Sequence, residues 1–295
     1  MVTQATVGGC ADELHRLEEA LASLVGADGA DAATRRAYLQ LRHARLSGIL
    51  DELRAADSAT DTALRRYPQW PDLSYLRASA DLDMHRPSAA LARLDAAPEL
   101  AQSPDGLELR AAALEQLGRY PQAEACLTNV LATDPSWQAF ASLAQVRAAL
   151  RDRDAADALY ARAEDELTAK HMSAFAWVRA ARGELAAAAG DHETAWAHLR
   201  VASAAFPGYW LVEARVAGLL RREDRLDEAA AAYAAVRGRT GRPELAEALG
   251  EVHRQLGDDE QAARWQATAR AEYADSAARG ESLYHHHHDG GGGGH

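Results

Sequence analysis

A pattern of about 34 residues recurs along this chain, and each copy reads as two helices joined by a turn. The clearest copy spans residues 104–137, where apolar side chains at helical spacing precede Gly118 and a second apolar helical run ends at Pro135. Proline ends a helix because it has no N–H to donate and its ring clashes with the preceding turn. The repeated unit is therefore predicted to be a helical hairpin.

Seven copies of the unit follow one another at nearly constant spacing, with starts at Ala37, Trp70, Pro104, Trp137, Ala176, Trp210 and Pro243. A small residue returns at the same place in each second helix: Ala56, Ala89, Ala123, Ala156, Ala195, Ala229 and Ala262. Glycines follow the same register, in first helices at Gly183 and Gly250 and at turns at Gly118, Gly190 and Gly257. Two helices approach closely only where the side chains between them are small. The alanines of the second helices, and Gly183 and Gly250 of the first helices, are therefore expected to face the partner helix of their hairpin.

Two motifs within these units match a known repeat. Leu249 and Gly250 form a Leu–Gly pair in a first helix, and Ala229 with Tyr233 places an aromatic residue four positions after a small one. In these features the chain resembles the tetratricopeptide repeat (TPR) family, whose unit reads W-x2-L-G-x2-Y, then A-x3-F, then P. The resemblance covers residues 37–275 and implies an all-α fold, a right-handed superhelical solenoid of about seven TPR-like helical hairpins.

The first two copies depart from the family pattern. His43 and Arg77 stand where it has leucine or a small residue, and no copy has the first-helix tryptophan in its place. The register predicts three regions: residues 1–34 as an N-terminal capping helix and loop, residues 35–276 as the solenoid, and residues 277–295 as a flexible His/Gly-rich tail.

Two boundaries within these regions are predicted in more detail. Leucines at helical spacing predict the capping helix over residues 11–25, followed by a loop over residues 26–34. The fourth unit is longer than the others by an insertion around residues 164–175. The simplest expectation is that the insertion lengthens the second helix of that unit and the loop after it.

Charge and composition exclude several classes of protein. With 32 basic and 44 acidic residues, the net charge of −12 would repel a phosphate backbone, so no nucleic-acid partner is expected. No apolar run approaches the length of a membrane span. Two cysteines, Cys10 and Cys126, cannot build a disulfide framework, which favours the cytoplasm. The alternative is a lipid-anchored extracytoplasmic protein, because residues 7–10 resemble a lipobox, if an upstream start precedes them.

Motifs for catalysis are also missing from the sequence, which has no phosphate-binding glycine loop, nucleophile elbow or HExxH pair. We therefore expect no enzyme, no cofactor and a non-catalytic scaffold for protein–protein or protein–peptide interaction. The resemblance implies that an unknown protein or peptide partner binds a concave groove lined by the first helices. By register the groove receives Tyr38, Arg42, Arg45, Glu108, Glu115, Trp177, Glu184, Arg215, Arg221, Glu244, Glu247 and Glu251. The alternative reading is that these are solvated charges that keep the chain soluble.

The C-terminal tail suggests a second function. His285, His286, His287 and His288 are adjacent, and His295 follows across a glycine run. Neutral imidazole is a good ligand for nickel, zinc and copper, so the tail could capture a divalent metal in a metal-handling accessory protein. The other interpretation is that the tail is inert sequence, because a segment without fixed geometry must be ordered when it binds.

Overall fold

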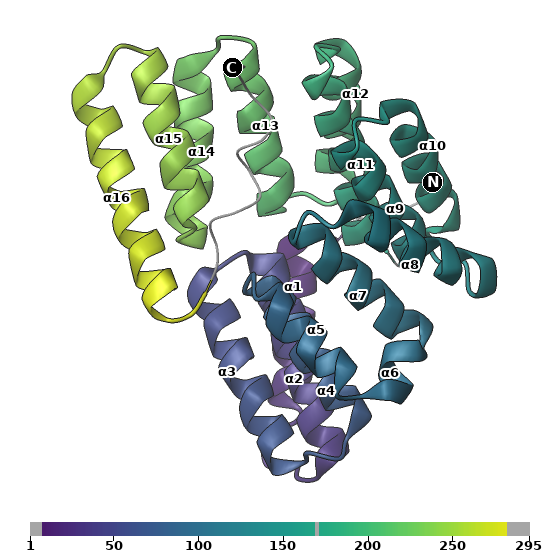
Figure 1. Ribbon diagram of the computed structural model, residues 1–295. Coiled ribbons are helices and arrows are strands. Elements are labelled where there is room, and N and C mark those ends of the chain that lie inside the picture. Colours follow the sequence, from purple (N-terminus) through teal and green to yellow (C-terminus); the bar gives the residue numbers. More distant parts are fainter. Residues whose placement is uncertain (1–7, 169–170, 282–295) are drawn as a thin grey trace, which may run out of the picture. The chain divides into compact units, whose positions relative to one another are not determined.

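The computed structural model describes residues 8–168 and 171–281, and every regular element in these two stretches is a helix (Figure 1). The sixteen helices are α1 (Cys10–Ala22), α2 (Ala30–Ser47), α3 (Leu50–Arg66), α4 (Pro71–Asp83), α5 (Pro87–Asp95), α6 (Pro98–Gln102), α7 (Pro104–Gln116), α8 (Tyr120–Thr133), α9 (Trp137–Ala149), α10 (Arg153–Glu166), α11 (Met172–Ala188), α12 (His192–Ala205), α13 (Trp210–Arg222), α14 (Leu226–Thr240), α15 (Pro243–Gln255) and α16 (Asp259–Ala278). The predicted all-α helical repeat solenoid is confirmed.

Seven helical hairpins make up the repeats. Helices α4 and α5, α7 and α8, α9 and α10, α11 and α12, and α13 and α14 pack as pairs. Short turns also join α2 to α3 and α15 to α16. The close approach predicted inside the hairpins is confirmed, because a Cβ on Gly183 would lie 3.2 Å from the Ala195 carbonyl oxygen of the partner helix. A Cβ on Gly250 would lie 3.4 Å from the Ala262 carbonyl oxygen.

The turn inside each hairpin fixes the true register. A residue with left-handed backbone lies two positions before each second helix begins: Gly48, His85, Gly118, Arg151, Gly190, Asp224 and Gly257. Five positions after it comes a buried residue of the second helix: Leu53, Ala90, Ala123, Ala156, Ala195, Ala229 and Ala262. Five of the seven predicted small residues are confirmed in this place.

The first two repeats are shifted from their predicted register. Leu53 and Ala90 take the places predicted for Ala56 and Ala89, because the turn comes three residues earlier in the first repeat and one residue later in the second. In the second repeat the shift places the fully buried Ala78 at the small first-helix position. The apparent departure at Arg77 therefore came from a register error of one residue.

The helices also differ from prediction in three places. Helix α2 begins at Ala30, inside the predicted loop, and α6 was not expected. The insertion in the fourth unit does not lengthen its second helix, because α10 has 14 residues, as α8 does. Most of the extra residues extend the next first helix, since α11 has 17 residues where α9 has 13. The predicted lengthening of the loop is confirmed, because the segment between α10 and α11 is longer than the one between α8 and α9.

The chain divides into two compact units, which are described separately. Of the described residues, unit 1 contains those within 1–26, 42–50 and 167–267, and unit 2 contains those within 27–41, 51–166 and 268–295.

Within unit 1, segments that are distant in the sequence pack together. The Cys10 amide at the start of α1 donates to the Pro207 carbonyl at 2.9 Å. The Trp210 indole donates to the Arg45 carbonyl at 3.1 Å, and the guanidinium of Arg242 lies 4.2 Å from the centroid of the Trp210 ring. Unit 1 is therefore held by more than contacts between successive hairpins.

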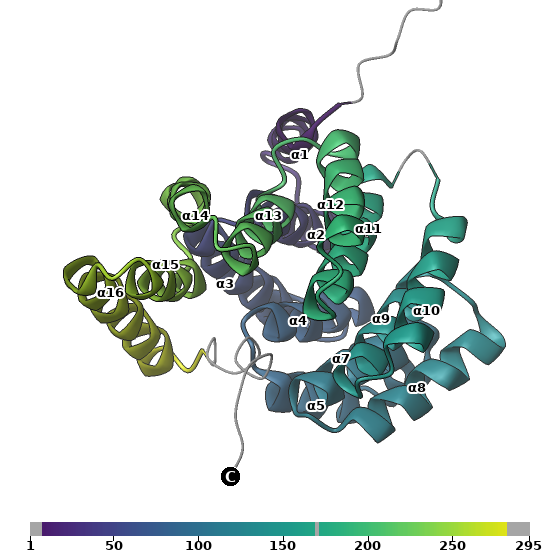
Figure 2. The ribbon, with the colours of Figure 1, turned by 90° about the horizontal axis from the view of Figure 1, so that it is seen from above.

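Within unit 2, helices α7 to α10 lie side by side (Figure 2) and share a core that includes Leu114, Leu127 and Val146. A second contact joins α3 to the last turn of α16 and to the residues just after it. Arg54 donates to Glu281 at 3.0 Å and to the Ser276 hydroxyl at 3.1 Å. Unit 2 thus also contains a contact between early and late parts of the chain.

Candidate docking pocket

A cavity of about 600 Å³ opens in unit 2 along the first halves of α2 and α4 and at the start of α7. Helix α6, just before α7, adds a fourth wall. Twelve residues line the cavity, here called the first-turn pocket: Asp31, Thr34, Arg35, Tyr38, Pro71, Asp72, Tyr75, Leu76, Glu99, Leu100, Ser103 and Asp105. The pocket therefore belongs to the first helices of three successive repeats.

Equivalent positions of these repeats recur around the pocket. Tyr38 and Tyr75 each lie ten residues before the left-handed turn residue of their hairpin. Arg35, Asp72 and Asp105 each lie thirteen residues before it. Residues three apart on a helix share a face, so both positions point to the same side of their helices. The repeat thus presents one helix face to the pocket several times.

The lining of the pocket is acidic and partly aromatic. Four carboxylates, from Asp31, Asp72, Glu99 and Asp105, oppose the single guanidinium of Arg35. Each carboxylate lies in the first turn of its helix, where the backbone N–H groups and the helix dipole stabilise negative charge. The Tyr38 side chain is 48% exposed. The pocket therefore offers negative charge beside an accessible aromatic ring.

Of the residues predicted for the groove, Tyr38 lines this pocket. Glu108 and Glu115 lie further along α7. Glu108 accepts a hydrogen bond from the Ser136 hydroxyl at 2.9 Å, and burial nevertheless raises the pKa of its carboxyl. Burial raises the pKa of Glu115 to about 7. Near neutral pH, α7 thus carries a carboxyl that is only partly ionised.

In unit 1, several predicted groove residues are engaged with neighbouring side chains. Arg42 forms an ion pair with Glu13 of α1. Arg215 donates to Glu184 at 2.9 Å, which links α13 to α11. Such pairs tie helices together, so the charges of these residues are already balanced within unit 1.

The other predicted groove residues of unit 1 are spread over four helices. Arg45 lies in the last turn of α2, and Trp177 is half-buried on α11. Arg221 lies beside the Tyr233 hydroxyl, where its positive charge offsets part of the rise in the Tyr233 pKa that burial causes. Glu247 is half-buried on α15, and Glu251 accepts from Gln255 at 3.1 Å. The first-turn pocket does not include these side chains, and their role as binding residues stays a prediction.

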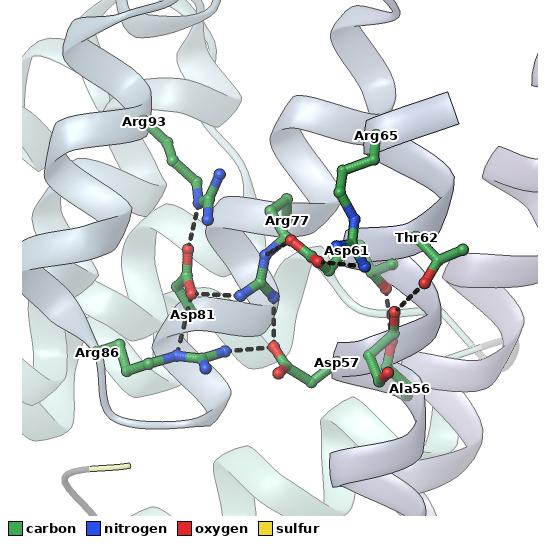
Figure 3. A network of polar contacts seen from close by, with 11 residues as sticks. Ala56, Asp57, Asp61, Thr62, Arg65, Arg77, Asp81, Arg86 and Arg93 are labelled. Carbon is green, nitrogen blue, oxygen red and sulfur yellow. Dashed lines mark hydrogen bonds and ion pairs between the residues drawn. The ribbon is translucent and has the colours of Figure 1, made fainter. Parts of the chain in front are cut away.

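A buried ionic network was missed by the sequence analysis (Figure 3). Arg77 of α4 is 4% exposed and donates to Asp81, one turn further on, at 2.8 Å. Asp81 also accepts from Arg93 at 2.5 Å and pairs with Arg86 at 3.0 Å. Asp57 of α3 accepts from both Arg77 and Arg86. The network joins α3, α4 and α5, so these charges have a structural role.

No group of three or more His, Cys, Asp or Glu side chains within residues 8–168 and 171–281 is placed to hold a metal ion. The metal-binding histidines of the prediction, residues 285–288 and 295, lie outside the described residues. Burial raises the pKa of the Cys10 thiol to about 11, so this thiol is not an activated nucleophile. No helix in the described part of the chain is long and apolar enough to cross a membrane.

Among protein-family models and curated proteins, none matches this chain. Several solved structures do match this chain. A chain of the APC/C hetero-tetramer Cut9–Hcn1 aligns with a TM-score of 0.67 at 13% identity and covers 86% of this chain. The Rap conjugation gene regulator of plasmid pLS20, solved in complex with the Phr* peptide, aligns with a TM-score of 0.65 at 13% identity. It covers 86% of this chain and 77% of its own.

A TPR protein of Thermus thermophilus, TTC0263, aligns with a TM-score of 0.56 at 21% identity, over 65% of this chain and 99% of its own. The chain spans about half the length of the matched Cut9–Hcn1 chain, 49%. At these identities the likeness concerns the fold. This chain has the tetratricopeptide-repeat fold, and the resemblance seen in its motifs is confirmed at that level.

Proposed function

We propose that this chain is a non-catalytic scaffold that docks a protein or peptide on the faces of its first helices. The observation that carries the proposal is the first-turn pocket, to which three successive repeats contribute equivalent positions. A surface to which successive repeats contribute the same helix positions suits an extended segment, which also presents side chains at regular spacing. The Rap regulator, which shares the fold, was solved with a bound peptide.

Peptide display followed by site-specific cross-linking tests this function. Random 12-residue peptides are selected on the purified full-length protein. A photo-cross-linking amino acid then replaces Tyr38 in the pocket or, as a control, Val201, which is exposed on the second helix α12. Selected peptides are expected to cross-link at position 38 and not at position 201. Equal cross-linking at both positions, or no enriched peptide, would contradict the proposal.

The metal-handling alternative remains an untested prediction. It rests on the histidines of the tail, outside the described residues, and the neighbours in fold offer nothing in its favour. Metal titration of the full chain and of a variant that lacks residues 285–295 separates the two functions. If the full chain and the shortened variant bind nickel equally well, and likewise zinc, the metal-handling alternative is wrong.

A further inference from the structure

We propose that the first-turn pocket binds an arginine or lysine side chain carried on an extended segment of a partner protein. This proposal rests on the scaffold function above and names the chemistry of its partner. Two features of the lining lead to it: the excess of carboxylates and the tyrosine rings beside them.

The carboxylates surround the pocket from four helices. Asp31 comes from α2, Asp72 from α4, Glu99 from α6 and Asp105 from α7. The N-termini of the longer helices α2, α4 and α7 each contribute about half a positive charge, which offsets part of this negative charge. When the positive charge of Arg35 is included, the net charge of the lining side chains is still negative. A cation entering the pocket would therefore meet acceptors from several directions.

The tyrosines supply the second half of the recognition. Tyr38 and Tyr75 occupy equivalent positions on neighbouring first helices. The face of an aromatic ring attracts a guanidinium or ammonium group, and long basic side chains also bury their methylene stems against such rings. An acidic segment would be repelled by the same lining. A purely apolar segment would leave the carboxylates desolvated and unpaired, which is costly.

The size of the pocket fits a side chain together with part of its backbone. A cavity of about 600 Å³ is within the range of sites that bury small ligands. The pocket also lies across three successive repeats, so a segment that fills it contacts α2, α4 and α7 at once. An extended segment meets this geometry.

Peptide binding to charge-neutralised variants tests the inference. Fluorescence anisotropy measures the affinity of three labelled 12-residue peptides, alternating Arg–Ser, Gln–Ser and Glu–Ser, for the full-length protein. The pocket variant carries Asp31→Asn, Asp72→Asn and Glu99→Gln. The control variant carries Asp154→Asn, Glu193→Gln and Asp227→Asn, which are likewise first-turn acids but lie outside the pocket. Both variants lose the same charge, and circular dichroism checks that both fold.

The Arg–Ser peptide is expected to bind the wild type and the control variant, and to bind the pocket variant about tenfold more weakly. Tyr38→Ala is expected to weaken binding about two- to fivefold, whereas Tyr38→Phe keeps the ring and the affinity. Equal losses in the pocket and control variants would overturn the inference, because they would indicate non-specific attraction.

Failure of this inference is distinguishable from failure of the scaffold function. If displayed peptides cross-link at position 38 but carry no basic residues, the basic-segment inference is wrong and the docking function stands. If no displayed peptide cross-links there, both are wrong.

Discussion

Asp81 is 1% exposed, and three arginines neutralise its charge. A buried charge is tolerated when it is paired and hydrogen-bonded, and removal of one partner leaves the other uncompensated. Arg77 is the residue that depends on Asp81 most, because both side chains are almost completely buried. The network therefore fixes how α4 packs against α3 and α5.

Removal of the central carboxylate is expected to be strongly destabilising. Asp81→Ala leaves the Arg77 guanidinium buried with one carboxylate partner fewer and is expected to lower the free energy of unfolding by about 3–5 kcal/mol. Urea denaturation measures this effect. Asp154→Ala, which removes an exposed carboxylate of α10, is the control and should change stability by less than about 0.5 kcal/mol. Similar small losses in both variants would show that the network is not needed for stability.

Glu115 predicts a specific dependence of stability on pH. Burial raises its pKa in the folded protein from 4.5 to about 7, so between these values the folded state binds more protons than the unfolded state. Stability contributed by this group is therefore present at low pH and is lost as pH rises from about 4.5 to about 7. Glu115→Gln should remove this dependence. The unfolding free energy of the variant minus that of the wild type should therefore be about 1–3 kcal/mol larger at pH 8 than at pH 4.5.

Denaturation of wild type and Glu115→Gln across this pH range measures the difference between them. Other titrating groups are common to both proteins and cancel in the comparison. A difference between the two proteins that does not change with pH would contradict the pKa of Glu115.

At the scale of elements, the turn between α2 and α3 packs against other segments of unit 1. Gly48 has a φ of +73°, which a residue with a side chain adopts only under strain. A Cβ there would also lie 2.6 Å from the Trp210 ring of α13. Arg242 donates to the Gly48 carbonyl at 2.9 Å. The backbone conformation of this turn thus favours glycine, and the contact with Trp210 leaves no room for a larger residue.

Two glycine variants separate these requirements. Gly118 has a φ of +69°, but a Cβ added there would have no atom within 4 Å beyond its neighbours in the chain. Gly118→Ala therefore measures backbone strain alone and is expected to lower the free energy of unfolding by about 1–2 kcal/mol. Gly48→Ala is expected to cost about 1–3 kcal/mol more in thermal or urea unfolding, because the methyl group collides with Trp210. In the Trp210→Ala background this extra cost should disappear. Equal costs for the two glycine variants would mean that the turn does not pack against α13.

Much of the repeat pattern could be predicted from the sequence. Units three to seven have their small residues and glycines in one register, and those positions pack as expected. The first two units could not be placed as well, because their turn residues are unequally spaced and alanine is common enough to fit a wrong register. Tyr38 still lines the pocket despite this shift, since three residues bring the chain back to nearly the same side of a helix.

The candidate site was predictable only in part. Tyr38 was placed in it because helical register determines which side chains share a face. The acidic lining from Glu99 could not be predicted, because α6 is a short helix between two repeats. The role of Arg77 was also missed, since its carboxylate partners lie on α3 and α4 and the repeat pattern does not specify how these helices pack.

For the whole molecule, stability does not come from neighbouring repeats alone. In a simple repeat array each unit contacts its neighbours, and stability is approximately a sum of local terms. Unit 1 instead joins Cys10 to Pro207, and unit 2 joins Arg54 to Glu281. These contacts between distant parts of the sequence are expected to make unfolding within each unit more cooperative than in a linear array.

The central claim is that the first helices of successive repeats form the docking face of this protein. Hydrogen–deuterium exchange of the full-length protein, alone and with a peptide selected by display, tests it most directly. We predict slower exchange on binding in the segments at the pocket, the first halves of α2, α4 and α7, with no change in the second helices α10 and α12. Protection confined to second helices, or no protection at the pocket while the peptide is bound, would contradict the account.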